Sequence, residues 1–218
     1  MSAYMHPSRV LITAAFVLAG VSNAMAASSV DLSVVGVITP SACTPTLSGD
    51  GVVDHGKISI QDFPEFGYKV LPKATLQLEV ACDAPVLMAV KSTDNRPGTA
   101  IPTYPTQPQD LSRFGLGLTS AGKKIGWYEL STSNATADDN PVGLIESPTG
   151  NTWVNAPDRS TWQPGWMRTA HDSSSAPFPM TRFSAQVGVA TTLTGKRDLP
   201  IAEEVYIDGS ATLDVVYL

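Results

Sequence analysis

The fold class is decided by the stretch Ala74-Thr75-Leu76-Gln77-Leu78-Glu79-Val80-Ala81-Cys82. Small or apolar side chains occupy every second position, and mostly polar ones fill the positions between them. This period of two is the pattern of a half-buried β-strand, because successive side chains of a strand point to opposite faces. The stretch therefore predicts a strand whose inner face ends on a cysteine.

The same alternation recurs along the chain, and no capped, helix-periodic stretch exceeds a turn or two. Turn-forming sequences such as Gly49-Asp50-Gly51 separate the alternating segments. Many short strands with frequent turns predict an all-β antiparallel sandwich. The further predicted strands are residues 30–38, 86–93, 114–119, 124–130, 181–192 and 209–217, with Phe183, Ala185, Val187 and Val189 forming one face. Long loops are expected near 97–108, which holds four prolines, and near 151–179.

Composition excludes several classes of protein. The chain has 218 residues, of which 43% are hydrophobic and 16% charged, so it is not a disordered chain. No linker-like tract divides it, which favours one domain. The net charge is −6 and no basic cluster is present, so a nucleic-acid partner is not expected.

The N-terminus has the features of a secretory signal peptide. Arg9 precedes an apolar run of about ten residues, and Ala24-Met25-Ala26 forms a small-x-small cleavage site. The run is shorter than the roughly 20 residues that a membrane-spanning helix needs. We therefore expect residues 1–26 to be removed on export and residues 27–218 to form a mature domain that does not span a membrane.

Export changes what the two cysteines predict. An oxidising compartment favours a disulfide between Cys43 and Cys82, the only cysteines of the chain. Two free thiols are the alternative. A zinc or redox pair would need closer spacing or further His and Cys ligands.

The segment from Gly209 to Leu218 alternates as well, and the chain stops one residue after Tyr217. A strand that ends flush with the carboxylate has no following strand to pair with its outer side. We expect such a strand to border an exposed edge or an apolar groove, which is a site for addition of a further β-strand.

Together these residues resemble a subunit of the chaperone–usher pilus system. The resemblance is carried by the signal peptide, by Gly36 seven positions before Cys43, by the second cysteine at the end of a strand, and by an alternating C-terminal strand with penultimate Tyr217. More narrowly, segments such as Asp94-Asn95-Arg96 resemble an uncharacterised family of fimbrial-like exported proteins.

The resemblance implies an immunoglobulin-like Greek-key sandwich that lacks its last strand and is completed by a donated one. Its implied partners are a periplasmic chaperone, an outer-membrane usher and other pilus subunits, and its implied destination is the periplasm and then the fimbria at the cell surface. The residues implied to contact the donated strand or the chaperone are Ala211, Leu213, Val215, Tyr217 and Leu218.

One departure from the pilin pattern concerns the donor segment. If Val30–Ile38 is the fold's own first strand, only Ala27-Ser28-Ser29 precede it and little remains to donate to a neighbour. This favours a position at a fibre end or a protein that does not polymerise.

The chief alternative is a self-complete secreted sandwich that binds carbohydrate, as an adhesin or lectin does. Trp127, Trp153, Trp162 and Trp166 lie close in sequence, and aromatic faces stack on sugar rings. The same rings could instead anchor a long insertion to the sandwich.

Other chemistry has little support in the sequence. His55 follows Asp54 and His171 precedes Asp172, but adjacent residues of a strand point to opposite faces. The common motifs of hydrolases, metalloproteases and phosphate-binding loops are missing from the sequence. The Asp138-Asp139-Asn140 run lacks the pattern of a calcium hand. We expect no enzyme activity, no metal and no cofactor.

Overall fold

The computed structural model describes residues 30, 32–36, 42–102, 111–200 and 203–218. It divides into two units, residues 1–38 and residues 39–218, which are described separately. The predicted signal peptide and part of the predicted loop at 97–108 lie outside the described residues. No helix among the described residues has the length and apolar character needed to cross a membrane.

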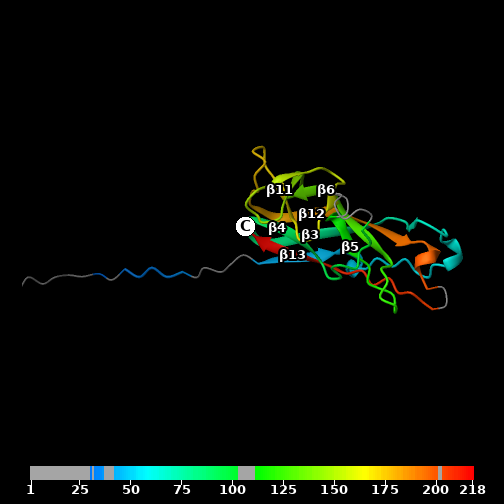
Figure 1. Ribbon diagram of the computed structural model, residues 1–218. Helices are drawn as coiled ribbons and strands as arrows, with labels where there is room; N and C mark the ends of the chain where they lie inside the picture. The colour runs from blue at the N-terminus through cyan, green and yellow to red at the C-terminus, as the bar shows by residue number, and fades with distance from the viewer. Residues whose placement is uncertain (1–29, 31, 37–41, 103–110, 201–202) are drawn as a thin grey trace, which may run out of the picture. The chain divides into compact units, whose positions relative to one another are not determined.

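The second unit is an all-β sandwich of two antiparallel sheets, as the alternation predicted (Figure 1). The first sheet has the order β1-β3-β12-β6-β10, with β2 paired to β12 and with β5 and β7 paired to β6. Its strands are β1 (Cys43–Leu47), β2 (Tyr68–Val70), β3 (Ala74–Val86), β5 (Arg113–Gly115), β6 (Gly126–Ala137), β7 (Asn140–Pro141), β10 (Thr161–Trp162) and β12 (Met180–Thr194).

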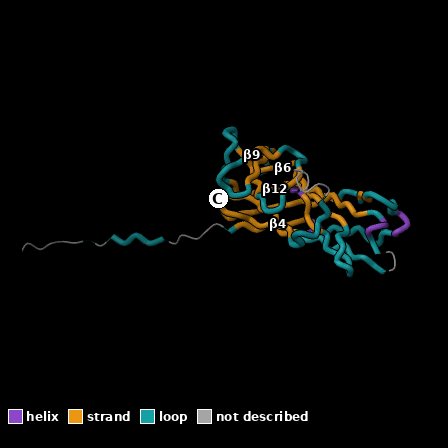
Figure 2. The backbone as a smooth tube through the Cα atoms, in the orientation of Figure 1, coloured by secondary structure: helices purple, strands orange, loops and turns teal. Residues whose placement is uncertain are grey.

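The second sheet has the order β13-β4-β11-β8-β9. Its strands are β4 (Met88–Asp94), β8 (Gly143–Ser147), β9 (Val154–Ala156), β11 (Met167–His171) and β13 (Ala211–Tyr217). Helical structure among the described residues consists of short 3₁₀ turns, which include η1 (Ser48–Gly51), η2 (Ile60–Asp62) and η4 (Lys196–Asp198) and appear as small purple segments in Figure 2.

The core lies between the sheets, and the strands follow their predicted faces. In β12 the side chains of Phe183, Ala185, Val187 and Val189 are all buried, which confirms that predicted face. They share one apolar cluster with Met88 and Val90 of the second sheet. Alternation thus places apolar side chains inward on both sheets, and their burial supplies the main driving force for folding.

Three sequence predictions differ from the structure. Of the predicted strand 114–119, only Phe114 and Gly115 lie in a strand, β5, and Leu118 forms an isolated bridge with Lys124. Within the predicted first strand, the described residues 30 and 32–36 form no strand, and the side chain of Val30 is 94% exposed. The expected loop at 151–179 instead contains β9, β10 and β11, and β11 is the central strand of the second sheet. Its strands are two to five residues long, and Arg168 in β11 breaks the apolar alternation on which the prediction relied.

The predicted disulfide joins Cys43 to Cys82. The two residues are directly opposed in the β1–β3 pair, so the bond fastens the first residue of edge strand β1 to its single neighbour in the sheet. Replacing both cysteines with Ser should lower the free energy of unfolding by about 3–4 kcal/mol, because the open chain gains conformational entropy when it unfolds. Urea unfolding of both proteins measures this. Reductant should destabilise the wild type and leave the double variant unchanged. Equal stability of the oxidised wild type and the double variant would contradict the expectation.

Candidate functional site

Two sheet edges border the same side of the sandwich. Among the described residues, β1 pairs only with β3, and β13 pairs only with β4. The two edges approach each other where the Cys43 backbone N–H donates a hydrogen bond to the Tyr217 hydroxyl at 3.0 Å. Figure 1 shows the blue β1 and the red β13 running beside each other. Along the rest of their length each strand carries backbone groups without a sheet partner on its outer side.

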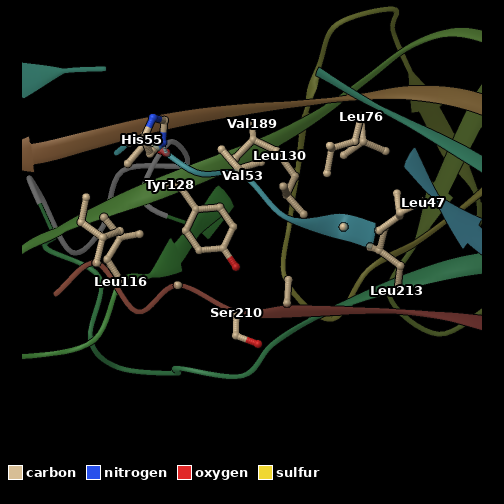
Figure 3. Close-up of a pocket in the computed structure, with 16 residues that line it drawn as sticks. Leu47, Val53, His55, Leu76, Leu116, Tyr128, Leu130, Val189, Ser210 and Leu213 are labelled. Atoms are coloured by element: carbon tan, nitrogen blue, oxygen red, sulfur yellow. Dashed lines mark hydrogen bonds between the residues drawn. The ribbon is translucent and has the colours of Figure 1, made fainter. Parts of the chain in front are cut away.

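An apolar groove with a cavity volume of about 240 Å³ lies behind these edges (Figure 3). Its walls come from both sheets and from the segment between η1 and η2. The apolar side chains that line it are Leu47, Val53, Leu76, Leu116, Leu130, Val187, Val189, Ile207, Ala211 and Leu213. A second hollow of about 450 Å³ adjoins it and shares Leu47, Gly51 and Leu213. The groove therefore continues along the gap between β1 and β13.

Burial differs across the groove. Lining residues of the interior strands, such as Val187 and Leu130, are buried, whereas Leu47 of β1 and Leu213 of β13 are only half-buried. A closed sandwich would bury both of these leucines, because each points toward the core. The edge residues thus retain apolar surface that a further strand between β1 and β13 would cover.

The five residues expected to contact a donated strand occupy different places. Ala211 and Leu213 line the groove, and Val215 packs against the core on the same face of β13. Tyr217 is 52% exposed and holds the end of β1 through Cys43. The Leu218 backbone N–H donates to the Leu87 carbonyl oxygen at 3.0 Å. The structure therefore places Ala211 and Leu213 in the groove, whereas Tyr217 and Leu218 lie at its end.

The other end of the groove is polar. His55 Nε2 lies 3.0 Å from Thr191 Oγ1, and Ser210 Oγ accepts from Asn95 Nδ2 at 3.0 Å. Sequence reasoning considered His55 only as part of a catalytic pair, and here it joins the segment after η1 to β12. Nothing in a linear pattern could show that contact, because it spans 136 positions.

An ion pair between Arg96 and Asp208, called the charged clamp below, borders the same end of the groove. Arg96 donates from Nε and Nη2 to the two carboxylate oxygens of Asp208, both at 2.9 Å. The hydrogen bond from Arg96 holds the pKa of Asp208 below its usual value. Asp208 also donates its backbone N–H to the Leu116 carbonyl oxygen at 3.0 Å. The clamp thus fixes the chain just before β13, where the groove wall begins.

Tyr128 of β6 also lines the groove and was not singled out in the sequence. Alternation within the predicted strand 124–130 would have placed it on the inward face with Leu130. Burial raises the pKa of its hydroxyl strongly. The hydroxyl therefore stays protonated even in alkaline solution, where an ordinary tyrosine ionises.

The four tryptophans do not gather on one surface. Trp127 and Trp162 are buried, and Trp153 and Trp166 are half-buried. The Trp127 ring packs edge-on against Tyr68 and lies under the Arg113 guanidinium at 3.9 Å. Trp162 Nε1 donates to the Trp166 carbonyl oxygen at 2.9 Å. These contacts are those of rings that anchor strands to the sandwich.

The remaining candidates for chemistry make local contacts. Asp138 Oδ1 accepts from the Thr181 hydroxyl and from the backbone N–H of Thr181 and Arg182, which lowers its pKa. His171 Nδ1 lies 2.7 Å from the Asp172 carbonyl oxygen. No group of three or more His, Cys, Asp or Glu side chains suited to a metal ion occurs in the part of the chain that the structure describes.

Comparison with known proteins gives relatives along most of the chain. Residues 32–112 match a family model described as a protein of unknown function (DUF1120). The chain is 28% identical to Protein GltF of Escherichia coli (strain K12), over 90% of this chain and 92% of that protein. It is 25% identical to the Uncharacterized protein YhcF of the same strain, over 90% of this chain and 93% of that protein. The chain is similar to all three. None of these names states a substrate or a partner.

Proposed function

We propose that this protein is a structural subunit of a fimbria of the chaperone–usher type, exported to the periplasm and then assembled at the cell surface. The observation that carries the proposal is the apolar groove between the unpaired outer edges of β1 and β13. An inserted strand would satisfy the backbone groups of both edges and bury the half-exposed Leu47 and Leu213. The protein then works by strand complementation, first with a chaperone and later with a neighbouring subunit, and not by catalysis.

The N-terminal segment supports a role as donor as well. Residues 30 and 32–36 belong to no strand, and Val30, Leu32 and Val34 are each about nine-tenths exposed. A position at a fibre end was expected on the condition that residues 30–38 form the fold's own first strand. The described residues of this range form no strand, so the condition is not met. An exposed segment with apolar side chains at alternate positions matches an apolar groove that lacks a strand. We therefore propose that the subunit both accepts and donates a strand.

Carbohydrate binding through a tryptophan surface is the weaker proposal. A sugar-stacking surface needs exposed ring faces, and two of the four rings are buried in the sandwich.

Peptide binding tests the proposed function. A fluorescent peptide with the sequence of residues 28–38 should bind the chain that begins at Ala27, and Leu213→Asp should weaken this binding at least tenfold, because a carboxylate would face the apolar groove. Leu118→Asp is the matched control, since Leu118 is 49% exposed and does not line the groove. Fluorescence anisotropy measures both. No binding to the wild type, or equal loss in both variants, would argue against the groove.

A further inference from the structure

The hydroxyl of Tyr128 is buried in the groove without a hydrogen-bond partner. The residue is 6% exposed, and its oxygen is one of two buried side-chain polar atoms in the described structure that lack a partner. Figure 3 shows the ring and its hydroxyl among the side chains that line the groove. Buried polar groups are nearly always paired, so an exception needs a physical reason.

The ring is held in this position by its neighbours. It stacks on Phe114 with ring centroids 5.2 Å apart. Gly209, just before β13, lies so close that a Cβ there would be 3.0 Å from the Tyr128 ring and 2.9 Å from Leu116. Because packing fixes the ring on both sides, the hydroxyl cannot readily turn away to find water.

The polar groups nearby already have partners. Asp94 accepts from the Arg96 and Gly115 backbone N–H groups at 2.8 and 3.0 Å, and Arg96 is paired with Asp208. The other polar side chains that line the groove, His55, Thr191 and Ser210, are hydrogen-bonded as described above. None of these groups hydrogen-bonds to the Tyr128 hydroxyl, so it is free to pair with a polar atom of a strand that enters the groove.

We propose that the Tyr128 hydroxyl is a specificity-determining contact of the groove, which hydrogen-bonds to a polar atom of the inserted strand. This rests on the proposed function, and the occupant is the segment 28–38 of a neighbouring copy of the chain. The lining side chains repack as the strand enters and bring one of its polar atoms to the hydroxyl. A purely apolar groove would accept any strand with apolar side chains at alternate positions, whereas a buried hydroxyl disfavours a strand that leaves it unpaired.

This role predicts opposite effects of one substitution on two measurements. Tyr128→Phe removes only the hydroxyl, so the empty domain should melt at the same temperature as the wild type or higher, because an unpaired buried group is lost. The same variant should bind the 28–38 peptide about five- to tenfold more weakly, as expected for loss of one hydrogen bond. Thermal unfolding and fluorescence anisotropy measure the two effects.

Tyr206→Phe is the matched control, because Tyr206 is 75% exposed and its hydroxyl donates to Glu204 away from the groove. It should leave peptide affinity unchanged. A Tyr128→Phe variant that binds as tightly as the wild type overturns this inference alone, and so does one that loses stability and affinity in parallel. A wild type that binds no peptide overturns the proposed function together with it.

Discussion

A copy of residues 28–38 joined after Leu218 by a short Gly/Ser linker is expected to raise the melting temperature by roughly 20 °C. Leu218 stands at the end of edge strand β13, so a tight turn brings the added strand alongside β13 in the antiparallel sense. Four of its apolar side chains would then enter the groove, each contributing about 1.5–3 kcal/mol before the cost of ordering the strand. Linkage also makes insertion intramolecular, at an effective concentration in the millimolar range.

The control is the same fusion carrying Asp at the copied positions of Leu32 and Val34. It has the same length and linker but cannot bury these side chains, so its melting temperature should stay close to that of the unfused chain. Differential scanning calorimetry of the three proteins, all oxidised and all starting at Ala27, makes the comparison. If the unfused chain already melts cooperatively at high temperature and fusion changes nothing, the sandwich needs no further strand and the groove proposal fails.

The first strand shows where sequence reasoning failed. Apolar residues recur at every second position from Val30 to Val34, yet the described residues of the range 30–38 form no strand. A period of two shows that a segment can pair and bury one face, but it does not identify the partner. If the proposed function is correct, the strand that pairs with residues 30–38 belongs to another chain. A pattern within one sequence cannot show such a partner.

The edge strand β1 was missed for the opposite reason. Its sequence, Cys43-Thr44-Pro45-Thr46-Leu47, contains a proline and has apolar side chains only near its ends. Proline is tolerated at a sheet edge, where its missing N–H faces away from the ladder. The C-terminal edge β13 was predicted because its alternation is clear. The wall of the groove formed by β13 could therefore be predicted, whereas the wall formed by β1 and the contact of His55 with Thr191 could not.

Strand β11 escaped prediction because its second residue, Arg168, is a buried charge. The side chain of Arg168 is 1% exposed, and its Nε and Nη2 donate to Glu146 Oε2 at 2.9 and 2.7 Å. Glu146 lies directly opposite on β8. A charged residue in mid-strand normally indicates an exposed position. Here the pair is internal, which sequence alone does not reveal.

The guanidinium also links the two sheets. Nη1 donates to Thr132 Oγ1 of β6 at 2.5 Å, and Nη2 donates to the Thr161 carbonyl oxygen of β10 at 2.6 Å. Further hydrogen bonds reach the backbone and side-chain oxygens of Ser160, both at 3.1 Å. Burial lowers the pKa of Arg168, while Glu146 acts in the other direction. The hydrogen bonds and the ion pair thus compensate a costly desolvation.

Arg168→Leu should therefore lower the free energy of unfolding by about 3–5 kcal/mol, because Glu146 and the oxygens of Ser160 and Thr161 lose their donor inside the sandwich. For a domain of this size the melting temperature should fall by roughly 10 °C. Urea unfolding and calorimetry measure the two quantities. The double variant Arg168→Leu/Glu146→Leu should recover part of the loss, since replacing both charges leaves no unpaired ion.

Arg182→Leu is the matched control. Arg182 Nη1 lies 3.5 Å from Asp139 Oδ1, and both side chains are more than half exposed. Its loss should change stability by at most about 1 kcal/mol. If Arg168→Leu were no more damaging than this control, the cross-sheet hydrogen bonds would contribute little, and apolar packing between the sheets would have to account for the burial of the arginine.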